Sequence, residues 1–400
     1  MTKTKRRARG EGSVSQYQTK AGGRWLIKYH DAEGIVRLKR GYLTKKAAAD
    51  ALGDINADIR NGRYVAPTKT TLGDWLDEWV DGLRLAPSSM ASYRRNIEHH
   101  VKPYLGNVPL QQLTGHRLTK LYRELETSGK VNHKKGTGLS PRSVRYVHTI
   151  VKAALKSAVD HGKIAKNPAT LAVPPSARDA KSPEIHPWTG EQLGLFLAWA
   201  KERRTDIFPA WHLLAYTGIR RGELLALRWR DVDLNDGRIS IRRSLTPVRT
   251  KGQGLSLIEG LTKGKASRVV DIDPTTVAVL KAHRLARGAL AMPLIRDTAL
   301  VFANQEGDRL HPDAFTRRFT ESVASCARKP GEDALPTVRL HDLRHTHATL
   351  LLKAGINVKI VSERLGHASV GITWDTYQHV MPGMQREAAA QFAALMGGAG

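Results

Sequence analysis

The hydrophobic and polar positions of this chain change their period twice, and these changes divide it into segments. In the first segment, apolar and polar residues alternate over 13–18, 24–30 and 35–42, with turn residues between the runs. Alternation of this kind predicts β-strands joined by hairpins. Apolar residues then recur with helical spacing over 44–62. We therefore expect a small three-stranded sheet covered by one helix.

Between residues 71 and 162 the apolar positions follow the period of amphipathic helices. Four stretches begin at Thr71, Pro87, Thr114 and Ser140, residue types that cap or open helices. Each stretch then places apolar residues every three or four positions, so that one face can be buried. These stretches predict a four-helix domain.

The last segment mixes both periods. A capping box at Thr189 and Gln192 opens a helix, and further helical stretches follow it. Alternating runs at 238–245, 255–261 and 268–273 interrupt the helices. This pattern predicts a mainly helical domain that contains a small antiparallel sheet.

Five prolines between residues 167 and 187 break any periodicity, so this stretch is predicted to be an interdomain linker. The expected fold class is α+β and multidomain. In chain order we expect a sheet-and-helix domain at 1–66, a helical domain at 67–166, the linker at 167–187 and a mainly helical domain at 188–400.

Composition points to a polyanionic partner. The 400 residues include 64 Lys and Arg against 37 Asp and Glu, which gives a net charge of +27 and a pI near 10.3. Residues 1–66 hold fifteen basic and six acidic residues, which gives 15 − 6 = +9. Charge alone does not separate DNA from RNA or from an anionic membrane. No run approaches the roughly 18 apolar residues of a transmembrane helix, so we expect a nucleic acid and no membrane.

A single cysteine, Cys326, excludes an intramolecular disulfide framework and suits a reducing cytoplasm. We expect it to be a small buried hydrophobe rather than a reactive thiol. The basic segment at 1–9 has no apolar stretch behind it, so it is not a secretory signal. These features favour a cytoplasmic protein.

The residues that carry chemistry gather in the stretch 341–379. It contains His341-x-x-Arg344, then Leu-Gly-His367, then Thr-x-x-x-Tyr377. Guanidinium and imidazole groups around a phenol suit in-line attack by a tyrosine hydroxyl on a phosphodiester. Because the reference pKa of tyrosine is near 10, such a hydroxyl needs a base or an electropositive pocket.

Two upstream segments supply further cations. Arg220 follows a Thr-Gly break at the start of a helix, and Glu223, one turn later, can orient its guanidinium. Taken alone, this pair would be a surface ion pair, and Arg221 is the neighbouring alternative. Lys263 and Lys265 lie in the hairpin predicted between the last two strands. Such a hairpin can deliver an ammonium group to a leaving oxygen.

In this ordered set the sequence resembles the tyrosine recombinases of the phage-integrase type. One His-x-x-Arg is weak evidence, whereas five elements in order, with family-like neighbours, are strong evidence. The positions that match the family's catalytic pattern are Arg220, Lys263, His341, Arg344, His367 and Tyr377. The match favours Arg220 over Arg221, and Lys263 over Lys265.

The resemblance implies a site-specific integrase that needs no metal, ATP or other cofactor. The two arginines would hold the nonbridging oxygens of the scissile phosphate. His341 would act as general acid or base, and His367 would add a hydrogen bond. Lys263 would protonate the departing 5′ oxygen, and Tyr377 would end joined to the 3′ phosphate.

The resemblance also implies partners. These are double-stranded DNA attachment sites, three further copies in a homotetramer that exchanges strands through a Holliday junction, and an excisionase and a DNA-bending host protein as candidate accessory factors. The place would be the nucleoid in the cytoplasm of a bacterial host. Residues 1–66 are similar to an arm-type DNA-binding domain and 67–166 to a core-binding domain. The polar loop at 128–138 either becomes ordered on DNA or is only solvated.

Rival interpretations remain. His341 and His345 stand at i and i+4, so a metal hydrolase is one rival, but it leaves the remote Arg, Lys and Tyr unexplained. A DNA-binding regulator without catalysis is another, and a type IB topoisomerase shares similar chemistry. We expect His345, His347 and His379 to make packing or phosphate contacts rather than to catalyse.

Overall fold

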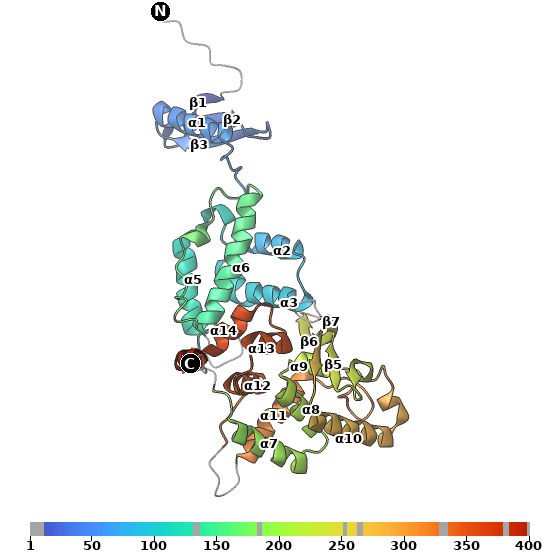
Figure 1. Cartoon of the computed structure of the whole chain (residues 1–400). Helices are drawn as coiled ribbons and strands as arrows, with labels where there is room; N and C mark the ends of the chain where they lie inside the picture. Colours follow the sequence, from blue (N-terminus) through green and yellow to red (C-terminus); the bar gives the residue numbers. More distant parts are fainter. Residues whose placement is uncertain are drawn as a thin grey trace, which may run out of the picture. The chain divides into compact units, whose positions relative to one another are not determined.

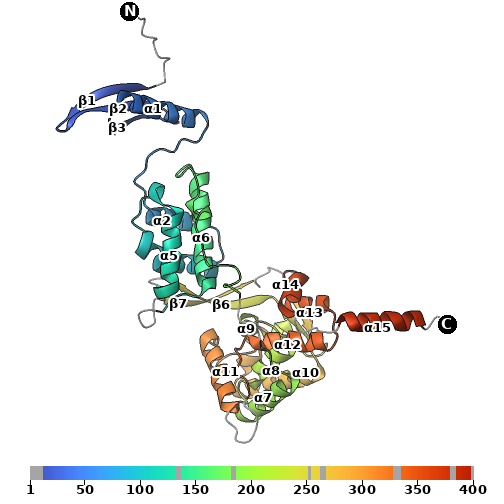
Figure 2. The ribbon, with the colours of Figure 1, turned by 90° about the vertical axis from the view of Figure 1, so that its left-hand side faces the viewer.

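A computed structural model gives the fold of the chain (Figure 1, Figure 2). It describes residues 12–130, 137–181, 186–250, 254–261, 267–327, 335–378 and 384–397. Contacts between residues divide the chain into two compact units, Met1–Ser182 and Pro183–Gly400. Across the described ranges, no helix has both the length and the apolar composition needed to cross a lipid bilayer.

An antiparallel sheet covered by one helix begins the first unit. Its elements, in the order in which the strands pair, are β1 (Ser13–Thr19), β2 (Gly22–His30) and β3 (Val36–Tyr42), followed by α1 (Lys45–Arg60). Ile27 and Tyr29 of β2 are buried against Ala48 and Leu52 of α1. The Thr44 hydroxyl caps the helix. The predicted sheet and its covering helix are confirmed.

The rest of the first unit is a helical domain with its own core. Its elements are α2 (Leu72–Asp81), α3 (Pro87–Asn96), a π-helical turn (Ile97–Val101), α4 (Lys102–Leu105), α5 (Gly115–Ser128) and α6 (Pro141–Asp160). The four predicted helical stretches are present, and Thr71 forms the capping box of α2 with Asp74. Trp75 is buried in the core and donates its indole hydrogen bond to the Ala154 carbonyl of α6, 2.8 Å away.

The first residues of the stretch predicted as a linker pack on this helical core. Ala169 and Ala172 are buried there, and the Val173 N–H donates to the Thr119 hydroxyl at 3.0 Å. Gly115 allows the close approach, because a Cβ at this position would lie 2.9 Å from the Leu171 backbone. The five prolines therefore do not keep the whole stretch away from the domain before it.

The second unit is mainly helical. Its helices are α7 (Gly190–Arg203), α8 (Phe208–Thr217), α9 (Arg221–Leu225), α10 (Pro274–Leu290), α11 (Pro312–Cys326), α12 (Asp342–Lys353), α13 (Val358–Leu365), α14 (Val370–Tyr377) and α15 (Met384–Gly397). Trp188, Phe196, Trp211 and Phe319 form an aromatic cluster in its core. Cys326 is buried in the same core, as predicted.

The described residues also form short 3₁₀ helices at Leu110–Gln112, Pro168–Thr170, Trp229–Asp231 and Met292–Ile295.

The strands of the second unit form two sheets, where one was predicted. The first contains β4 (Val232–Asp233), β5 (Arg238–Ile241) and β8 (Arg268–Asp271), and the second is a hairpin of β6 (Arg243–Thr250) and β7 (Gly254–Leu261). Because β8 pairs with β5 and β7 pairs with β6, the expected hairpin between β7 and β8 is wrong. Alternation identifies a strand but not its partner, which depends on contacts distant in sequence. The α+β fold class is confirmed.

Candidate active site

Arg220 is positioned by a break between two helices. α8 ends at Gly218, whose φ of 65° is left-handed, and α9 begins directly after Arg220. A Cβ at Gly218 would lie 2.7 Å from Leu365 and 2.8 Å from His347, so only glycine fits this turn. The backbone N–H of Arg220 donates to Glu223 Oε2 at 2.9 Å. The predicted projection of Arg220 from a helix start is thus present.

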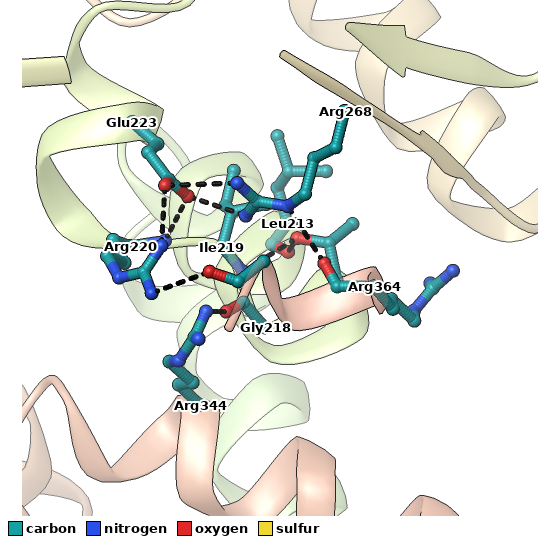
Figure 3. Close-up of polar contacts among 10 residues, drawn as sticks. Leu213, Gly218, Ile219, Arg220, Glu223, Arg268, Arg344 and Arg364 are labelled. Carbon is teal, nitrogen blue, oxygen red and sulfur yellow. Dashed lines mark hydrogen bonds and ion pairs between the residues drawn. The ribbon is translucent and has the colours of Figure 1, made fainter. Parts of the chain in front are cut away.

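Glu223 is a buried carboxylate that holds two arginines (Figure 3). Arg220 Nη1 donates to Oε1 at 2.9 Å, and Arg268 donates through Nη1 and Nη2 at 3.1 and 2.7 Å. Burial alone raises the pKa of Glu223, but the hydrogen bonds and charges of Arg268 and Arg220 together outweigh it, and the pKa lies below its usual value. The carboxylate is therefore ionised at neutral pH, and the pair is not a surface ion pair.

Arg268 was not predicted as a site residue. From β8 it binds Glu223 of α9, and its Nε donates to the Arg364 carbonyl at 3.0 Å, close to the end of α13 (Figure 3). Arg220 Nη2 donates to the Gly366 carbonyl at 3.1 Å, two residues after Arg364. Arg268 and Arg220 together join three elements that are far apart in sequence. No local pattern could have revealed contacts with these separations.

Arg344 lies in α12 and is 4% exposed. Its Nη1 donates to the Gly218 carbonyl at 2.7 Å, so the same turn that places Arg220 also anchors Arg344 (Figure 3). Within the described residues, its buried Nη2 has no hydrogen-bond partner. Burial lowers the pKa of Arg344 to about 9, and the charge of Arg220 acts in the same direction. A buried, charged donor of this kind needs an anion.

His367 and His341 lie around the two arginines. His367 follows the left-handed Gly366 at the end of α13, and its Nδ1 is 2.6 Å from the Thr373 hydroxyl. Burial lowers the pKa of His367 to about 4, with Arg344 as the next cause, so the ring is neutral at neutral pH. If Thr373 donates to Nδ1, the ring proton is on Nε2 and can be donated to a ligand. Burial and Arg344 also lower the pKa of His341.

Tyr377 ends α14 and is 2% exposed. Its hydroxyl oxygen is 2.7 Å from His345 Nδ1. Burial raises the pKa of Tyr377 to about 12, and the charge of Arg344 opposes this shift. The phenol is therefore protonated at neutral pH and must lose its proton when it attacks.

The other predicted residues have different surroundings. Arg221 donates to the Pro312 carbonyl at 2.9 Å and to the Thr316 hydroxyl at 2.6 Å, so α11 holds its guanidinium. His347 is buried between the Ala215 carbonyl, 2.9 Å from Nδ1, and Arg364, whose Nε donates to Nε2 at 3.1 Å. These are packing contacts. Lys263, Lys265 and His379 lie outside the described residues.

A cavity of about 360 Å³ lies beside Arg344. Its lining combines Arg221, Arg339, His341, Arg344 and Thr316 with the apolar side chains of Leu214, Ile219, Leu340 and Leu343. The three arginines at this cavity favour an anionic group there. In the ranges that the structure describes, no three His, Cys, Asp or Glu side chains lie close enough to hold a metal ion.

Two sequence families match the chain. The phage integrase family matches residues 191–383, and the phage integrase N-terminal SAM-like domain matches residues 71–125. The chain is 28% identical over 358 residues to a tyrosine recombinase XerC-like protein of Caldanaerobacter subterraneus subsp. tengcongensis, covering 85% of this chain and 87% of that one. It is 24% identical over 410 residues to a putative prophage phiRv2 integrase of Mycobacterium tuberculosis, covering 99% of this chain and 98% of that one.

Solved structures share the fold. The Tn1549 transposon integrase in complex with a circular intermediate DNA superposes with a TM-score of 0.65 at 21% identity, covering 81% of this chain and 100% of that one. A lambda integrase tetramer bound to a Holliday junction superposes with a TM-score of 0.55 at 18% identity, covering 93% of this chain and 96% of that one. The chain belongs to the phage integrase family of tyrosine recombinases.

Proposed function

We propose that this chain is a site-specific DNA recombinase that cuts and rejoins DNA through a 3′-phosphotyrosyl bond. It would integrate, and also excise, a mobile element or a phage genome. The observation that carries the proposal is the buried donor of Arg344, which has no partner among the residues that the structure describes and whose charge acts on the hydroxyl of Tyr377. A nucleophile and an anion-binding donor in one site are what attack on a phosphodiester requires.

The scissile phosphate would bind where Arg344, Arg220 and His367 converge. Arg344 Nη2 supplies one charge-assisted hydrogen bond to a nonbridging oxygen, and His367 Nε2 supplies another. Arg220 adds a second guanidinium, held rigid by Glu223 and the Gly366 carbonyl. Because these donors are ordered before DNA arrives, they stabilise the transition state without reorganising. Removing one such donor typically costs about 10²–10³-fold in rate.

The covalent step conserves the energy of the diester. The Tyr377 oxygen bonds to phosphorus and gives up its proton to a base of the site, the bond to the 5′ oxygen breaks, and that oxygen takes a proton from Lys263. His341 acts as a general acid or base in the same site. The 5′ hydroxyl of a partner strand then attacks the phosphotyrosine in reverse, so that no ATP, metal or other cofactor is consumed.

Cleavage would occur in cis. Tyr377 contacts His345 of its own chain, and Arg344 of the same chain acts on it. Each protomer therefore has its nucleophile beside its own phosphate-binding arginine. The lambda integrase neighbour is a tetramer on a Holliday junction, which supports a homotetramer on DNA for this chain as well.

The basic sheet of the first unit would bind a second DNA site. On the face of β2 opposite α1, Arg24 and Lys28 alternate with the buried Ile27 and Tyr29. β3 adds Arg40 to this face, since it pairs with Leu26. A sheet of this size can enter a major groove and contact phosphates and base edges. The domain boundaries 1–66, 67–166, 167–187 and 188–400, an excisionase, a DNA-bending host protein and a nucleoid location belong to the same proposal.

The test is capture of the covalent adduct. Cells that carry the gene with its flanking DNA are lysed in denaturant, protein-linked DNA is recovered, and the linked ends are sequenced. The wild type should remain bound at one defined position, and Tyr377→Phe should recover nothing, because phenylalanine has no nucleophilic oxygen. An adduct that persists in Tyr377→Phe would remove Tyr377 as nucleophile, and a wild type that never forms one would contradict the proposed function.

A further inference from the structure

His345 contacts the atom that has to react. Its Nδ1 is 2.7 Å from the Tyr377 hydroxyl oxygen, and the two rings have centroids 5.7 Å apart. No other hydrogen-bond partner of this hydroxyl is found in the ranges that the structure describes. His341, to which the family pattern gives the acid–base role, instead meets the ring of His345 edge-on, with centroids 5.1 Å apart. The imidazole nearest the nucleophile is therefore His345.

The surroundings of His345 keep its ring neutral. Burial lowers its pKa to about 4, and His341 is the next cause. Arg344 and Arg339 act in the same direction, while Asp342 opposes them. The Asp342 carboxylate is itself occupied by Arg339, at 2.9 and 3.2 Å. A neutral imidazole has one nitrogen with a free lone pair, and the protonated phenol beside Nδ1 supplies the hydrogen.

We propose that His345 is a further catalytic residue, whose Nδ1 accepts the proton of Tyr377 as its hydroxyl attacks the scissile phosphate. The inference rests on the proposed function. In this step the O–P bond to Tyr377 forms, the bond to the 5′ oxygen breaks, and the phenolic proton moves to Nδ1. The imidazolium that forms faces the new phosphodiester and can return its proton when the strand is rejoined. His341 is then left to contact a phosphate oxygen.

Two substitutions separate proton transfer from simple positioning. His345→Ala removes the contact. His345→Asn places an amide oxygen at about the distance of Nδ1 from the backbone, so it can accept the hydrogen bond but cannot take up the proton. General-base catalysis typically contributes about 10²–10⁴-fold. Both variants should therefore form the adduct at least about 100-fold more slowly than the wild type on a duplex that contains the captured cleavage site.

A second substrate shows whether His345 removes the proton of Tyr377 or supplies a proton to the 5′ leaving oxygen. In a duplex whose 5′ bridging oxygen is replaced by sulfur, the leaving group departs without a proton. The sulfur substitution does not replace a missing base, so both His345 variants should still form the adduct slowly on this substrate. The rate of Lys263→Ala should recover, because the sulfur leaving group needs no proton. DNA affinity and the thermal unfolding midpoint of each variant, measured alongside, should stay close to those of the wild type.

Several results would overturn the inference while leaving the proposed function standing. If His345→Asn cleaves as fast as the wild type, the residue only positions the hydroxyl. If His345→Ala cleaves faster, the contact restrains the nucleophile. Recovery of the His345 variants on the sulfur substrate would make His345 a proton donor to the leaving group. If the wild type forms no adduct on either substrate, the proposed function fails instead.

Discussion

At the scale of single residues, Glu223 organises the candidate site. One buried carboxylate accepts hydrogen bonds from Arg220 and Arg268, and one further donor of each binds a carbonyl, that of Gly366 or of Arg364. Burying a carboxylate costs free energy unless its charge is compensated. Arg220 and Arg268 therefore both help to keep Glu223 ionised. Glu223, which orients the arginine proposed to bind phosphate, Arg220, thus depends on a third residue, Arg268.

Replacing Arg268 should destabilise the second unit. Arg268→Ala removes two of the hydrogen bonds to a carboxylate that is 2% exposed, and breaking such a buried pair typically costs about 3–5 kcal/mol. Arg268→Lys should recover only part of this loss, because a lysine ammonium cannot bridge both carboxylate oxygens and a carbonyl. Denaturant unfolding measures both values. A loss below about 0.5 kcal/mol for Arg268→Ala would contradict the network.

Adding Glu223→Gln to Arg268→Ala provides the matched control. If the two residues act as a unit, the double variant should lose less stability than the sum of the single variants. Strict additivity would mean that the hydrogen bonds between them contribute little.

At the scale of secondary structure, the turn between α8 and α9 positions both Arg220, which lies in it, and Arg344 of α12, which donates to it. Gly218 ends α8 in a left-handed conformation, its carbonyl accepts from Arg344, and Arg220 follows two positions later. The sequence predicted this break because Thr-Gly is a local signal at the end of an apolar helix. The break therefore couples the positions of two guanidinium groups that are 124 residues apart in sequence, since 344 − 220 = 124.

Gly218→Ala tests this coupling. The substitution places a Cβ 2.7 Å from Leu365 at a positive φ, so it should cost more than the roughly 1–2 kcal/mol of left-handed strain alone and shift the carbonyl that holds Arg344. Gly62→Ala is the matched control, because Gly62 has nearly the same φ of 64° but nothing within 4 Å of its Cβ. Cleavage should fall in Gly218→Ala and not in Gly62→Ala. Equal effects of both substitutions would contradict the role of the turn.

The secondary structure was largely predictable because its signals are local. The capping box at Thr189 and the spacing of apolar residues in α6 lie within a few residues of the helices they define. In the first unit the short turns between strands allowed their pairing to be predicted, whereas in the second unit β8 pairs with the distant β5, and the expected β7–β8 hairpin was wrong. Arg268 and the contact of His345 with Tyr377 escaped the sequence for a related reason: their partners are 45 and 32 residues away.

At the scale of the whole molecule, the net charge of +27 is spread over units with different proposed DNA contacts. The first unit offers Arg24, Lys28 and Arg40 on one face of its sheet, and the second offers the arginines of the site, of which Arg344 is buried. Contacts between the basic residues of the sheet and DNA phosphates should contribute affinity that depends on the salt concentration. The arginines of the site should contribute mainly to the rate of cleavage.

Removing charge from the sheet should therefore weaken binding to the flanking DNA without slowing cleavage at the captured site. For Arg24→Ala, Lys28→Ala and Arg40→Ala combined, affinity should fall, and the slope of log K against log salt should decrease by about 0.9 for each lost phosphate contact. Binding isotherms at several salt concentrations provide the measurement. The control removes the same charge from α1 through Lys45→Ala, Lys46→Ala and Arg60→Ala. Equal losses of DNA affinity in the two triple variants would mean that the effect depends only on net charge and not on the face of the sheet.

The most direct measurement of the central claim is the chemical identity of the residue that becomes linked to DNA. The adduct is trapped in denaturant, digested with nuclease and protease, and analysed by mass spectrometry. We predict a single modified peptide that carries a nucleotide 3′ phosphate on the Tyr377 oxygen. A nucleotide on any other residue, or a link through a 5′ phosphate, would contradict the account.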